Sequence, residues 1–590
     1  MAVTVDLMSS IFVTRRQSLA LALLVAFLVP AKAQDLLRDG YTPPPLDSVH
    51  AIAAEHGMVV AQERIAARIG ADILERGGNA IDAAVATGFA MAVTYPRAGN
   101  IGGGGFMIIH LAGPKKDIAI DYRETAPAAI AKDSFLDALG NADPQKSIAS
   151  GLGIGVPGTV AGLALAHRKF GSGKFTLAQL IAPSIPLARD GFIVDGDLAD
   201  TFASARPLFQ KWPSSAKVFL KPDEQSYAQG DKLVQTDLAN TLEAIAKNGQ
   251  RAFYQGPIAE KIASAVRNAG GVMTAADLKN YHAVERTPLR GQYHGYEIVS
   301  MPPPSSGGTH LIEILNILEG YDLNKTGLAS PDAAHILVEA MKRAYADRAV
   351  YLGDPDFVKV PTHLLTSKRY AQTLRKSIGE RATPSSDIRN GNPANPEGDN
   401  TTHFSVVDRF GNAVSNTYTL NLSYGVGLIA DGTGVLLNNE MDDFAAKPGA
   451  PNAFGLVGAD ANAPAPRKRP LSSMTPTIVM KDGKPYLVTG SPGGSRIIST
   501  VLQVIVNALD HNMPLEDATA APRIHHQWLP DQVSAERGYP QATLDVLRER
   551  GHEVMVRQPG TAANSILVTP KGLVGAADSR TRGSLAAGVD

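Results

Sequence analysis

The chain has 590 residues, 44% of them hydrophobic and 19% charged, which is ordinary for a globular protein and too large for one simple core, so we expect one large or two closely packed α/β units. Its formal net charge of -1 argues against nucleic acid or an anionic membrane surface as a partner and leaves small neutral or zwitterionic ligands open. The sequence contains no cysteine, which excludes disulfides, thiol nucleophiles and thiolate metal sites, so covalent catalysis would depend on Ser, Thr, Lys or a carboxylate.

The N-terminal segment, positions 1–33, has the pattern of a bacterial-type export signal. Arg15 and Arg16 precede an apolar run over positions 19–29, and the small residues Ala31 and Ala33 form a cleavage site. This apolar run is too short to cross a hydrocarbon layer of about 30 Å, which argues against a membrane anchor. We therefore expect cleavage near Ala33 and a periplasmic or secreted mature protein. The arginine pair leaves the choice between the general and twin-arginine export routes open.

The sequence of the N-terminal half predicts mostly helices. Residues 58–93 are rich in alanine, with apolar residues at helical spacing and a glycine pair at 77–78, which predicts two helices in a buried layer. Four consecutive glycines at 102–105 precede an apolar run rich in β-formers, and we expect them to let neighbouring backbone approach closely. Further on, residues 155–171 predict a turn and a helix ended by glycine, and a Gly/Pro/Ser turn opens another helix near Thr309.

The pattern changes after a polar segment. Residues 381–400 are rich in Pro, Asn, Ser and Gly and form the clearest linker pattern in the sequence. Residues 402–421 then contain two β-rich runs about a Gly-Asn turn, and residues 476–490 contain two about an Asp-Gly turn, both typical of hairpins. Residues 495–510 predict a helix. We therefore expect the C-terminal part, residues 401–590, to form a sheet with helices packed on it.

The sharpest chemical feature is the abrupt end of the linker at Asn400 and Thr401. If the chain is cut before Thr401, that residue gains a free α-amine of pKa about 8 beside its own hydroxyl, so one residue supplies a nucleophile and its general base. Threonine favours strands, so Thr401 and Thr402 could instead begin an ordinary strand. The pair alone favours that interpretation. The nucleophile hypothesis therefore depends on the rest of the sequence.

Six motifs resemble those of the γ-glutamyltransferase family and occur in the family's order. They are GGNAIDAAVA, DYRETAP, TTHFSVVD, LNNEMDDF, PLSSMTPTIV and TGSPGGSRI, and the matches run from about residue 50 to the last residues. The resemblance implies an α/β (α+β) fold of the N-terminal-nucleophile hydrolase type, an αββα four-layer sandwich built from two subunits of one precursor. It also implies self-cleavage between Asn400 and Thr401, giving a large subunit of residues 34–400 and a small subunit of residues 401–590.

The same resemblance implies the catalytic groups. The Thr401 hydroxyl would form an ester with the γ-glutamyl group, and Thr419, in the second strand of the first hairpin, would relay a hydrogen bond to it. Gly493 and Gly494 precede a helix start, where unpaired backbone N–H groups can form an oxyanion hole. Without the resemblance, Thr419 is as well explained as a strand threonine, and the glycines as a plain turn or a phosphate loop. No GK[ST] follows, which disfavours a nucleotide.

A γ-glutamyl group carries a free α-carboxylate and a free α-ammonium, and the resemblance implies residues for both. Arg123 would pair with the carboxylate, because a guanidinium suits a planar bidentate contact, and Ser472 and Ser473 would add hydroxyl donors. The residues implied for the ammonium are Asn421, Glu440 and Asp443. Without the resemblance, the acidic motif is better explained as a solvated turn. It lacks a glycine-pinned ligand loop, which disfavours calcium.

Residues 448–459 match the family's lid over the substrate pocket, and Phe454 stands where a tyrosine is common. A phenylalanine keeps the apolar cover and loses the phenolic hydrogen bond, which leaves the balance between water and amino-acid acceptors open. His525 and His526 have no third ligand at metal spacing and are expected to be structural. We expect no metal or organic cofactor. No GxSxG elbow is evident, which disfavours a Ser/His/Asp triad.

The sequence thus predicts a self-processing γ-glutamyltransferase and glutathione hydrolase. It would pass the γ-glutamyl group of glutathione or a related amide to water or to an amino-acid or peptide acceptor, and its large and small subunits would form a heterodimer. One alternative is a cephalosporin (glutaryl) acylase on the same scaffold, but the residues expected around the ammonium suit a free amino-acid head. The other is an exported, non-catalytic γ-glutamyl binding protein, which would need no self-cleavage.

Overall fold

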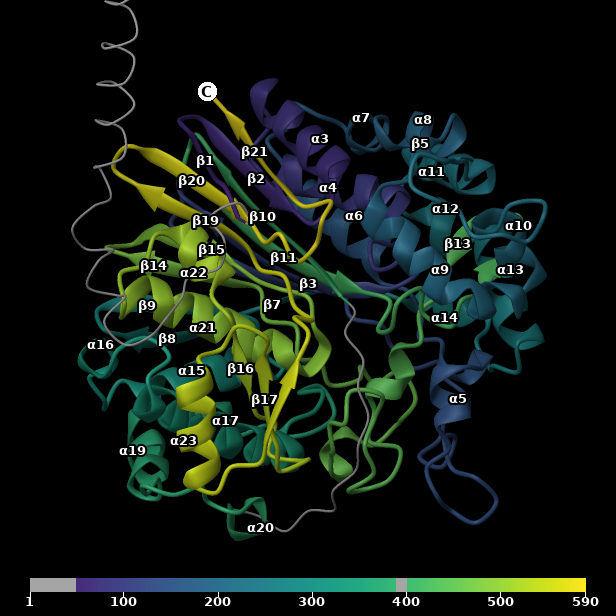
Figure 1. Cartoon of the computed structure of the whole chain (residues 1–590). Helices are drawn as coiled ribbons and strands as arrows, with labels where there is room; N and C mark the ends of the chain where they lie inside the picture. The colour runs from purple at the N-terminus through teal and green to yellow at the C-terminus, as the bar shows by residue number, and fades with distance from the viewer. Residues whose placement is uncertain (1–48, 389–400) are drawn as a thin grey trace, which may run out of the picture.

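Two seven-stranded sheets lie face to face at the centre of the molecule (Figure 1). They are seen in a computed structural model that describes residues 49–388 and 401–590. The predicted export signal, residues 389–400 of the predicted linker and therefore Asn400 lie outside these residues. Within the described ranges, no helix combines the length and the apolar character needed to span a bilayer.

The first sheet is antiparallel and is built around the predicted hairpin of residues 402–421. In spatial order its strands are β21 (Leu585–Val589), β2 (Gly57–Ala61), β10 (Thr402–Asp408), β11 (Ala413–Thr419), β3 (Gly104–Leu111), β4 (Lys116–Asp121) and β7 (Val284–Arg286). Thr402 lies opposite Tyr418 and Val407 opposite Ala413, so the predicted hairpin is confirmed. Its open end places Thr401 close to the end of β11.

The second sheet is also antiparallel and contains the other predicted hairpin. Its strands, in spatial order, are β1 (Ala51–Ala54), β20 (Gly572–Ala577), β19 (Asn564–Thr569), β15 (Lys484–Thr489), β14 (Thr477–Lys481), β9 (Tyr296–Ser300) and β8 (Leu289–Tyr293). The sequence suggested that residues 401–590 would form a sheet with helices packed on it, but they form no separate sheet. Both sheets instead interleave strands from before and after residue 401. The two parts of the chain therefore share one core.

Helices cover the outer face of each sheet, which gives four layers in the order αββα (Figure 1). The first sheet is covered by α3 (Arg64–Glu75), α4 (Ala80–Thr94) and α6 (Thr159–Phe170). The second is covered by α15 (Gly307–Leu318) and α22 (Leu515–Ala520), and α17 (Pro331–Tyr351) and α21 (Ile497–Leu509) pack against α15 in the same helical layer. The helices predicted after residue 155, near Thr309 and after residue 495 are confirmed. One prediction was wrong: residues 58–61 belong to β2, because a fully buried apolar strand has no alternation to separate it from a helix.

Shorter elements surround the four layers. The remaining helices are α5 (Pro144–Ile148), α7 (Leu177–Ile181), α8 (Ser184–Arg189), α9 (Gly196–Gln210), α10 (Pro213–Phe219), α11 (Thr236–Asn248), α12 (Arg251–Tyr254), α13 (Pro257–Asn268), α14 (Ala275–Asn280), α16 (Leu323–Thr326), α18 (Thr362–Leu365), α19 (Lys368–Lys376), α20 (Ser385–Ile388) and α23 (Gln541–Glu549). Small strand pairs and triplets are β5 (Phe192–Ile193) with β6 (Lys232–Leu233), β12 (Ile429–Ala430) with β13 (Val435–Leu436), and β16 (Ile524–His525) with β17 (Val533–Glu536) and β18 (Val554–Arg557). Helix α20 lies within the range predicted as a linker.

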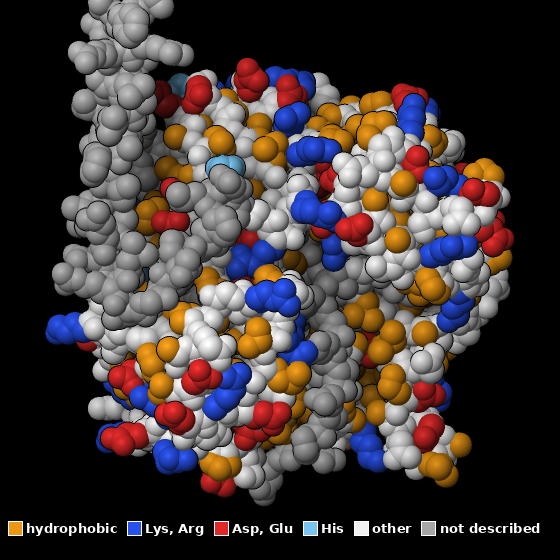
Figure 2. All heavy atoms as spheres, viewed as in Figure 1, with side chains coloured by type: hydrophobic (Ala, Val, Ile, Leu, Met, Phe, Trp, Pro, Cys, Tyr) orange, Lys and Arg blue, Asp and Glu red, His pale blue; other side chains and the backbone are white. Residues whose placement is uncertain are grey.

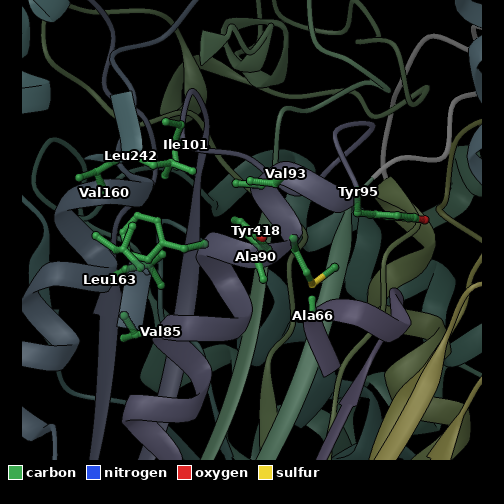
Figure 3. Close-up of a cluster of buried hydrophobic side chains, with 14 of the residues drawn as sticks. Ala66, Val85, Ala90, Val93, Tyr95, Ile101, Val160, Leu163, Leu242 and Tyr418 are labelled. Carbon is green, nitrogen blue, oxygen red and sulfur yellow. The ribbon is translucent and has the colours of Figure 1, made fainter. Parts of the chain in front are cut away.

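The core is divided between the two faces of the first sheet. Alternate residues of β2 point to opposite sides, so that Val59 joins the cluster under the helices and Val60 the cluster between the sheets. Figure 3 shows part of the first cluster, where Val85 of α4 lies near Leu163 of α6, and Tyr418 of β11 lies near Ala90 of α4. On the face of the molecule shown in Figure 2, basic and acidic side chains are interspersed, in keeping with the nearly neutral formal charge.

Candidate functional site

The open end of the β10–β11 hairpin holds two threonine hydroxyls. Thr401, the residue before β10, is 6% exposed, and its hydroxyl donates to that of Thr419, the last residue of β11, at 3.4 Å. The Thr419 hydroxyl also accepts from the backbone N–H of Asn421 at 2.9 Å. Gly103 packs beneath this end, since a Cβ there would lie 2.0 Å from the Thr419 carbonyl oxygen. The glycine run therefore permits the close backbone approach that the sequence predicted.

Arg123 is fully buried just after β4 and lies between acidic side chains. Its guanidinium contacts the carboxylate of Glu440 and donates to Asp443 Oδ2 at 2.5 Å, while Nε donates to the carbonyl oxygen of Pro470 at 3.1 Å. Burial favours the neutral form, but Glu440 and Asp443 outweigh it and hold the pKa of Arg123 above its usual value. The predicted carboxylate ligand and two of the predicted ammonium ligands thus face one another.

Glu124 is a buried acid of this site that the sequence analysis missed. One of its oxygens lies 3.9 Å from Arg123 Nη1, yet both of its oxygens, and the second oxygen of Glu440, accept no hydrogen bond in the described structure. Burial raises the pKa of Glu440 to about 7, although Arg123 opposes the shift. Burial and the charge on Glu440 raise the pKa of Glu124 well above its usual value. Two acids whose charged forms are disfavoured by burial thus lie beside Arg123.

Hydroxyl and amide groups complete the polar wall. The Ser472 hydroxyl accepts from the backbone N–H of Met474 at 3.1 Å, and the Ser473 hydroxyl accepts from Arg348 Nη2 at 3.2 Å. Asn421 has a φ of 76°, in the left-handed region where asparagine is tolerated, and its amide donates to the carbonyl oxygen of Asn439 at 2.9 Å. These contacts fix the direction of each polar side chain before any ligand arrives.

The glycine pair lies opposite the hydroxyls, under the predicted lid. Gly493 and Gly494 have φ angles of 129° and 53°, which side chains other than glycine rarely adopt, and they lead into α21. A Cβ on Gly494 would lie 2.4 Å from the ring of Phe454, which is 6% exposed. The aromatic ring therefore covers the backbone that was predicted to stabilise an oxyanion.

These residues line one small pocket. Its lining is Arg123, Thr401, Thr419, Asn421, Glu440, Asp443, Phe454, Leu456, Ser472, Ser473, Met474, Gly494 and Ile497. The predicted site residues of the described chain are thus brought together, with Gly493 adjacent to the lining. Leu456, Met474 and Ile497 add an apolar side that the sequence analysis did not identify. The pocket has a volume of about 20 Å³, roughly the room that one water needs, so a larger ligand must separate Arg123 from its acids or displace the lid.

Each of the two adjacent histidines has a hydrogen-bond partner within the fold. His525 Nδ1 lies 2.8 Å from the Ser499 hydroxyl, and His526 Nε2 lies 3.2 Å from Asp531. Neither histidine lines the pocket. In the ranges 49–388 and 401–590, no three side chains of His, Asp or Glu gather as metal ligands would. The described residues therefore offer no built metal centre beside the hydroxyl pair.

Several known proteins are similar to this chain in sequence and in fold. Residues 66–588 match the family model described as Gamma-glutamyltranspeptidase. Over 545 residues the chain is 52% identical to a glutathione hydrolase proenzyme of Escherichia coli strain K12, covering 92% of this chain and 93% of that protein. A cephalosporin acylase from Bacillus halodurans superposes with a TM-score of 0.81 at 26% identity, over 94% of this chain and 99% of that one. The gamma-glutamyltranspeptidase of Helicobacter pylori superposes with a TM-score of 0.54 at 49% identity, over 55% of this chain and 93% of that one.

Proposed function

Since the chain belongs to the gamma-glutamyltranspeptidase family, we propose that it is a self-processing γ-glutamyltransferase and glutathione hydrolase whose reaction proceeds through an ester on Thr401. The predicted αββα fold of the N-terminal-nucleophile type is confirmed by the stacked sheets and by the solved structures. One observation carries the mechanism: the hairpin holds the Thr401 and Thr419 hydroxyls 3.4 Å apart on the wall of a pocket that contains charges of both signs.

The proposed cleavage before Thr401 prepares the nucleophile. The Thr401 oxygen attacks the preceding carbonyl carbon, the C–N bond between Asn400 and Thr401 breaks as an ester forms, and the freed α-amine of Thr401 takes up the hydroxyl proton. Water then hydrolyses the ester, which frees the Thr401 hydroxyl and divides the chain into residues 34–400 and 401–590. The two subunits share both sheets, so they stay together as a heterodimer. The free amine then acts as the general base for the same hydroxyl, and Thr419 orients that hydroxyl.

Acyl transfer follows in two steps. The Thr401 oxygen attacks the γ-carbonyl carbon of the donor, and backbone N–H groups at Gly493 and Gly494 stabilise the negative oxygen of the tetrahedral intermediate. The C–N bond of the donor then breaks, the leaving amine takes up the proton, and a γ-glutamyl ester remains on Thr401. Water or the amine of an amino acid or peptide attacks the ester and releases glutamate or a new γ-glutamyl amide.

The charged wall supports recognition of a free amino-acid head. We propose that the α-carboxylate of the donor binds to Arg123, Ser472 and Ser473. Its α-ammonium binds to the acceptors on the opposite side, which are Asn421, Glu440 and Asp443. A zwitterionic head carries one charge of each sign, so it can enter between Arg123 and the two acids without changing the net charge of the buried site.

The acylase hypothesis is favoured by the likeness to the Bacillus halodurans structure. The pocket argues against it, because a glutaryl group lacks the ammonium and would leave Glu440 and Asp443 without a new partner. The two hypotheses are separated by comparing kcat/KM for γ-glutamyl-p-nitroanilide and glutaryl-p-nitroanilide. We expect the γ-glutamyl compound to react faster, and faster turnover of the glutaryl compound would overturn the proposed substrate class.

Mass spectrometry and a product assay test the mechanism together. The purified protein is expected to consist of two pieces that meet between Asn400 and Thr401, and glutathione is expected to yield glutamate and cysteinylglycine. Heat of binding without product release would support the binding-protein hypothesis instead. We also propose export to the periplasm or medium, in which case the larger piece begins near residue 34; a piece that begins at Met1 would contradict this.

A further inference from the structure

Arg348, on α17, differs from the other buried arginines. Five arginines are buried in the part of the chain that the structure describes: Arg123, Arg343, Arg348, Arg469 and Arg523. Four of them contact a carboxylate, but Arg348, 5% exposed, has none within ion-pair distance among the described residues. Burying a cation without an adjacent anion is unfavourable, so the fold holds Arg348 in place at a cost in stability.

The partners of Arg348 are hydroxyl groups behind the substrate pocket. Its Nε donates to the Ser306 hydroxyl at 3.0 Å, and its Nη2 donates to the Ser473 hydroxyl at 3.2 Å. Ser306 in turn donates to the carbonyl oxygen of Ser472 at 2.8 Å. Burial lowers the pKa of Arg348 to about 10, so the guanidinium stays charged at neutral pH. One cation thus contacts the two-serine segment both directly, at the Ser473 side chain, and through Ser306, at the Ser472 backbone.

These contacts set the direction of hydrogen bonds in the pocket. A guanidinium has donors and no acceptor, so the Ser473 oxygen must accept from Arg348 and must turn its own hydrogen elsewhere. Ser473 lines the pocket, where that hydrogen is available. The neighbouring Ser472 oxygen likewise accepts from a backbone N–H. Both serines can therefore donate a hydrogen bond to a ligand, which suits a carboxylate.

We propose that Arg348 is a positioning residue that makes the pocket select donors with a free α-carboxylate, by orienting and polarising the Ser473 hydroxyl. This inference rests on the proposed function, because it places the α-carboxylate of the donor beside Ser473. A hydrogen bond from a charged group is stronger than one between neutral groups, so Ser473 becomes a better donor when Arg348 binds its oxygen.

Three p-nitroanilides test this selection. The γ-glutamyl compound has both the carboxylate and the ammonium, the glutaryl compound keeps only the carboxylate, and the 4-aminobutanoyl compound keeps only the ammonium. We expect Arg348→Gln to lower kcat/KM roughly 10- to 100-fold for the two carboxylate compounds and less than about threefold for the 4-aminobutanoyl compound. Arg348→Lys keeps the charge and should restore part of the loss. Equal loss for all three compounds would show a purely structural role and would overturn the proposal.

A double-mutant cycle and a matched control complete the test. If Arg348 acts through Ser473, adding Arg348→Gln to the Ser473→Ala variant should lower kcat/KM for the carboxylate compounds by less than about a further threefold. Fully additive losses in the double variant would contradict a role of Arg348 through Ser473. Arg343, on the same helix and paired with Glu339, is the control, and Arg343→Gln should lower the Tm without changing the substrate ratios. If Arg348→Gln does not fold, Ser473→Ala alone must still reduce the preference for carboxylate compounds.

The two proposals fail in different ways. If the unmodified enzyme does not prefer the γ-glutamyl compound to the 4-aminobutanoyl compound, the proposed head-group recognition is wrong. If that preference exists and Arg348→Gln keeps it in full, only the role of Arg348 is wrong.

Discussion

The two ends of the β10–β11 hairpin differ in what surrounds their polar groups: those at the turn bond within the fold, and those at the open end lie on a pocket. At the turn, the buried carboxylate of Asp408 accepts from the backbone N–H of Ala80 at 2.9 Å, of Phe410 at 2.8 Å and of Asn412 at 3.0 Å. The Asn412 side chain adds a fourth donor at 2.7 Å. The buried carboxylate at this end of the hairpin therefore has all the hydrogen-bond partners expected of a buried polar group in a stable fold.

At the open end, the hydroxyls of Thr401 and Thr419 lie on the wall of the pocket. The hydroxyls of Thr401 and Thr419 lie 3.4 Å apart, which is long for a hydrogen bond between hydroxyl groups. Nearby, Glu124 and Glu440 keep oxygens without a hydrogen-bond partner in the described structure. Thr401, Thr419 and Glu440 line the pocket, so a complementary ligand can bond to them. Substitutions at the turn should therefore change stability with little effect on activity, whereas substitutions at or beside the open end should change activity, whether or not they also change stability.

The largest expected effect follows from removing the nucleophile at the open end. Thr401→Ala should leave one uncut chain and lower turnover of γ-glutamyl-p-nitroanilide by at least about 10⁴-fold, because no other residue is proposed to form the ester. Intact mass and a turnover assay measure both effects. Thr401→Ser keeps a hydroxyl and is the control that should retain cleavage and part of the activity. Two pieces from the alanine variant would contradict the assignment.

The next effect concerns the charged wall beside that nucleophile. Arg123→Ala should lower kcat/KM for the γ-glutamyl compound by about 10²- to 10³-fold and should destabilise the protein by about 3–5 kcal/mol, because Glu440 and Asp443 lose their cation while staying buried. Arg123→Lys keeps the charge without the planar contact, so its kcat/KM and stability should lie between those of the unmodified protein and the alanine variant. Kinetics and thermal unfolding measure the two losses, and unchanged turnover by the alanine variant would favour the acylase hypothesis.

The turn provides the opposite test. Asp408→Ala removes the acceptor of four hydrogen bonds and should lower the free energy of unfolding by about 2–4 kcal/mol. We expect kcat/KM per folded molecule to change less than about twofold, because the turn lies at the far end of two seven-residue strands. Chemical unfolding and active-site titration separate the two quantities. A large loss of activity in fully folded protein would remove the distinction between the two ends.

The sequence predicted both hairpins because their turn residues and β-rich runs are local signals. It did not predict that β10 would pair with β2, which lies far earlier in the chain, because no local pattern encodes a distant partner. For the same reason, the strands of residues 401–590 were wrongly assigned a sheet of their own. Strand β2 was taken for the start of a helix because it is buried on both faces.

The site was predictable only through motifs. Composition and spacing alone favoured an ordinary strand at Thr401, and the resemblance to a family supplied the other residues. Glu124 was missed although it follows Arg123 directly, because a buried acid beside an arginine has no distinctive spacing. Arg348 was missed because its helix carries no feature that connects it with Ser473, which lies far along the chain; only the fold brings the two together.

A smaller effect is expected from pH at the open end. The pKa of Glu440 is about 7 when folded and ordinarily 4.5, so between these values the folded protein binds more protons than the unfolded chain. Its contribution to stability therefore falls as the pH rises through this window. Glu440→Gln cannot titrate, so its Tm should depend less on pH between about 4.5 and 7 than that of the unmodified protein. Equal slopes for the two proteins would contradict the raised pKa.

The smallest effect concerns the lid over the glycine pair. Phe454 covers Gly494 with an apolar ring, and Phe454→Tyr would add a hydroxyl on the same pocket that the Asn421 amide lines. One added hydrogen bond contributes about 1 kcal/mol, or roughly fivefold, to closure of the lid. A firmer lid should exclude water and raise the ratio of transfer to hydrolysis by up to that factor, as measured with glycylglycine as the acceptor. Phe454→Leu keeps only the apolar cover and should not raise the ratio, so a rise in both variants would show that the added hydroxyl is not its cause.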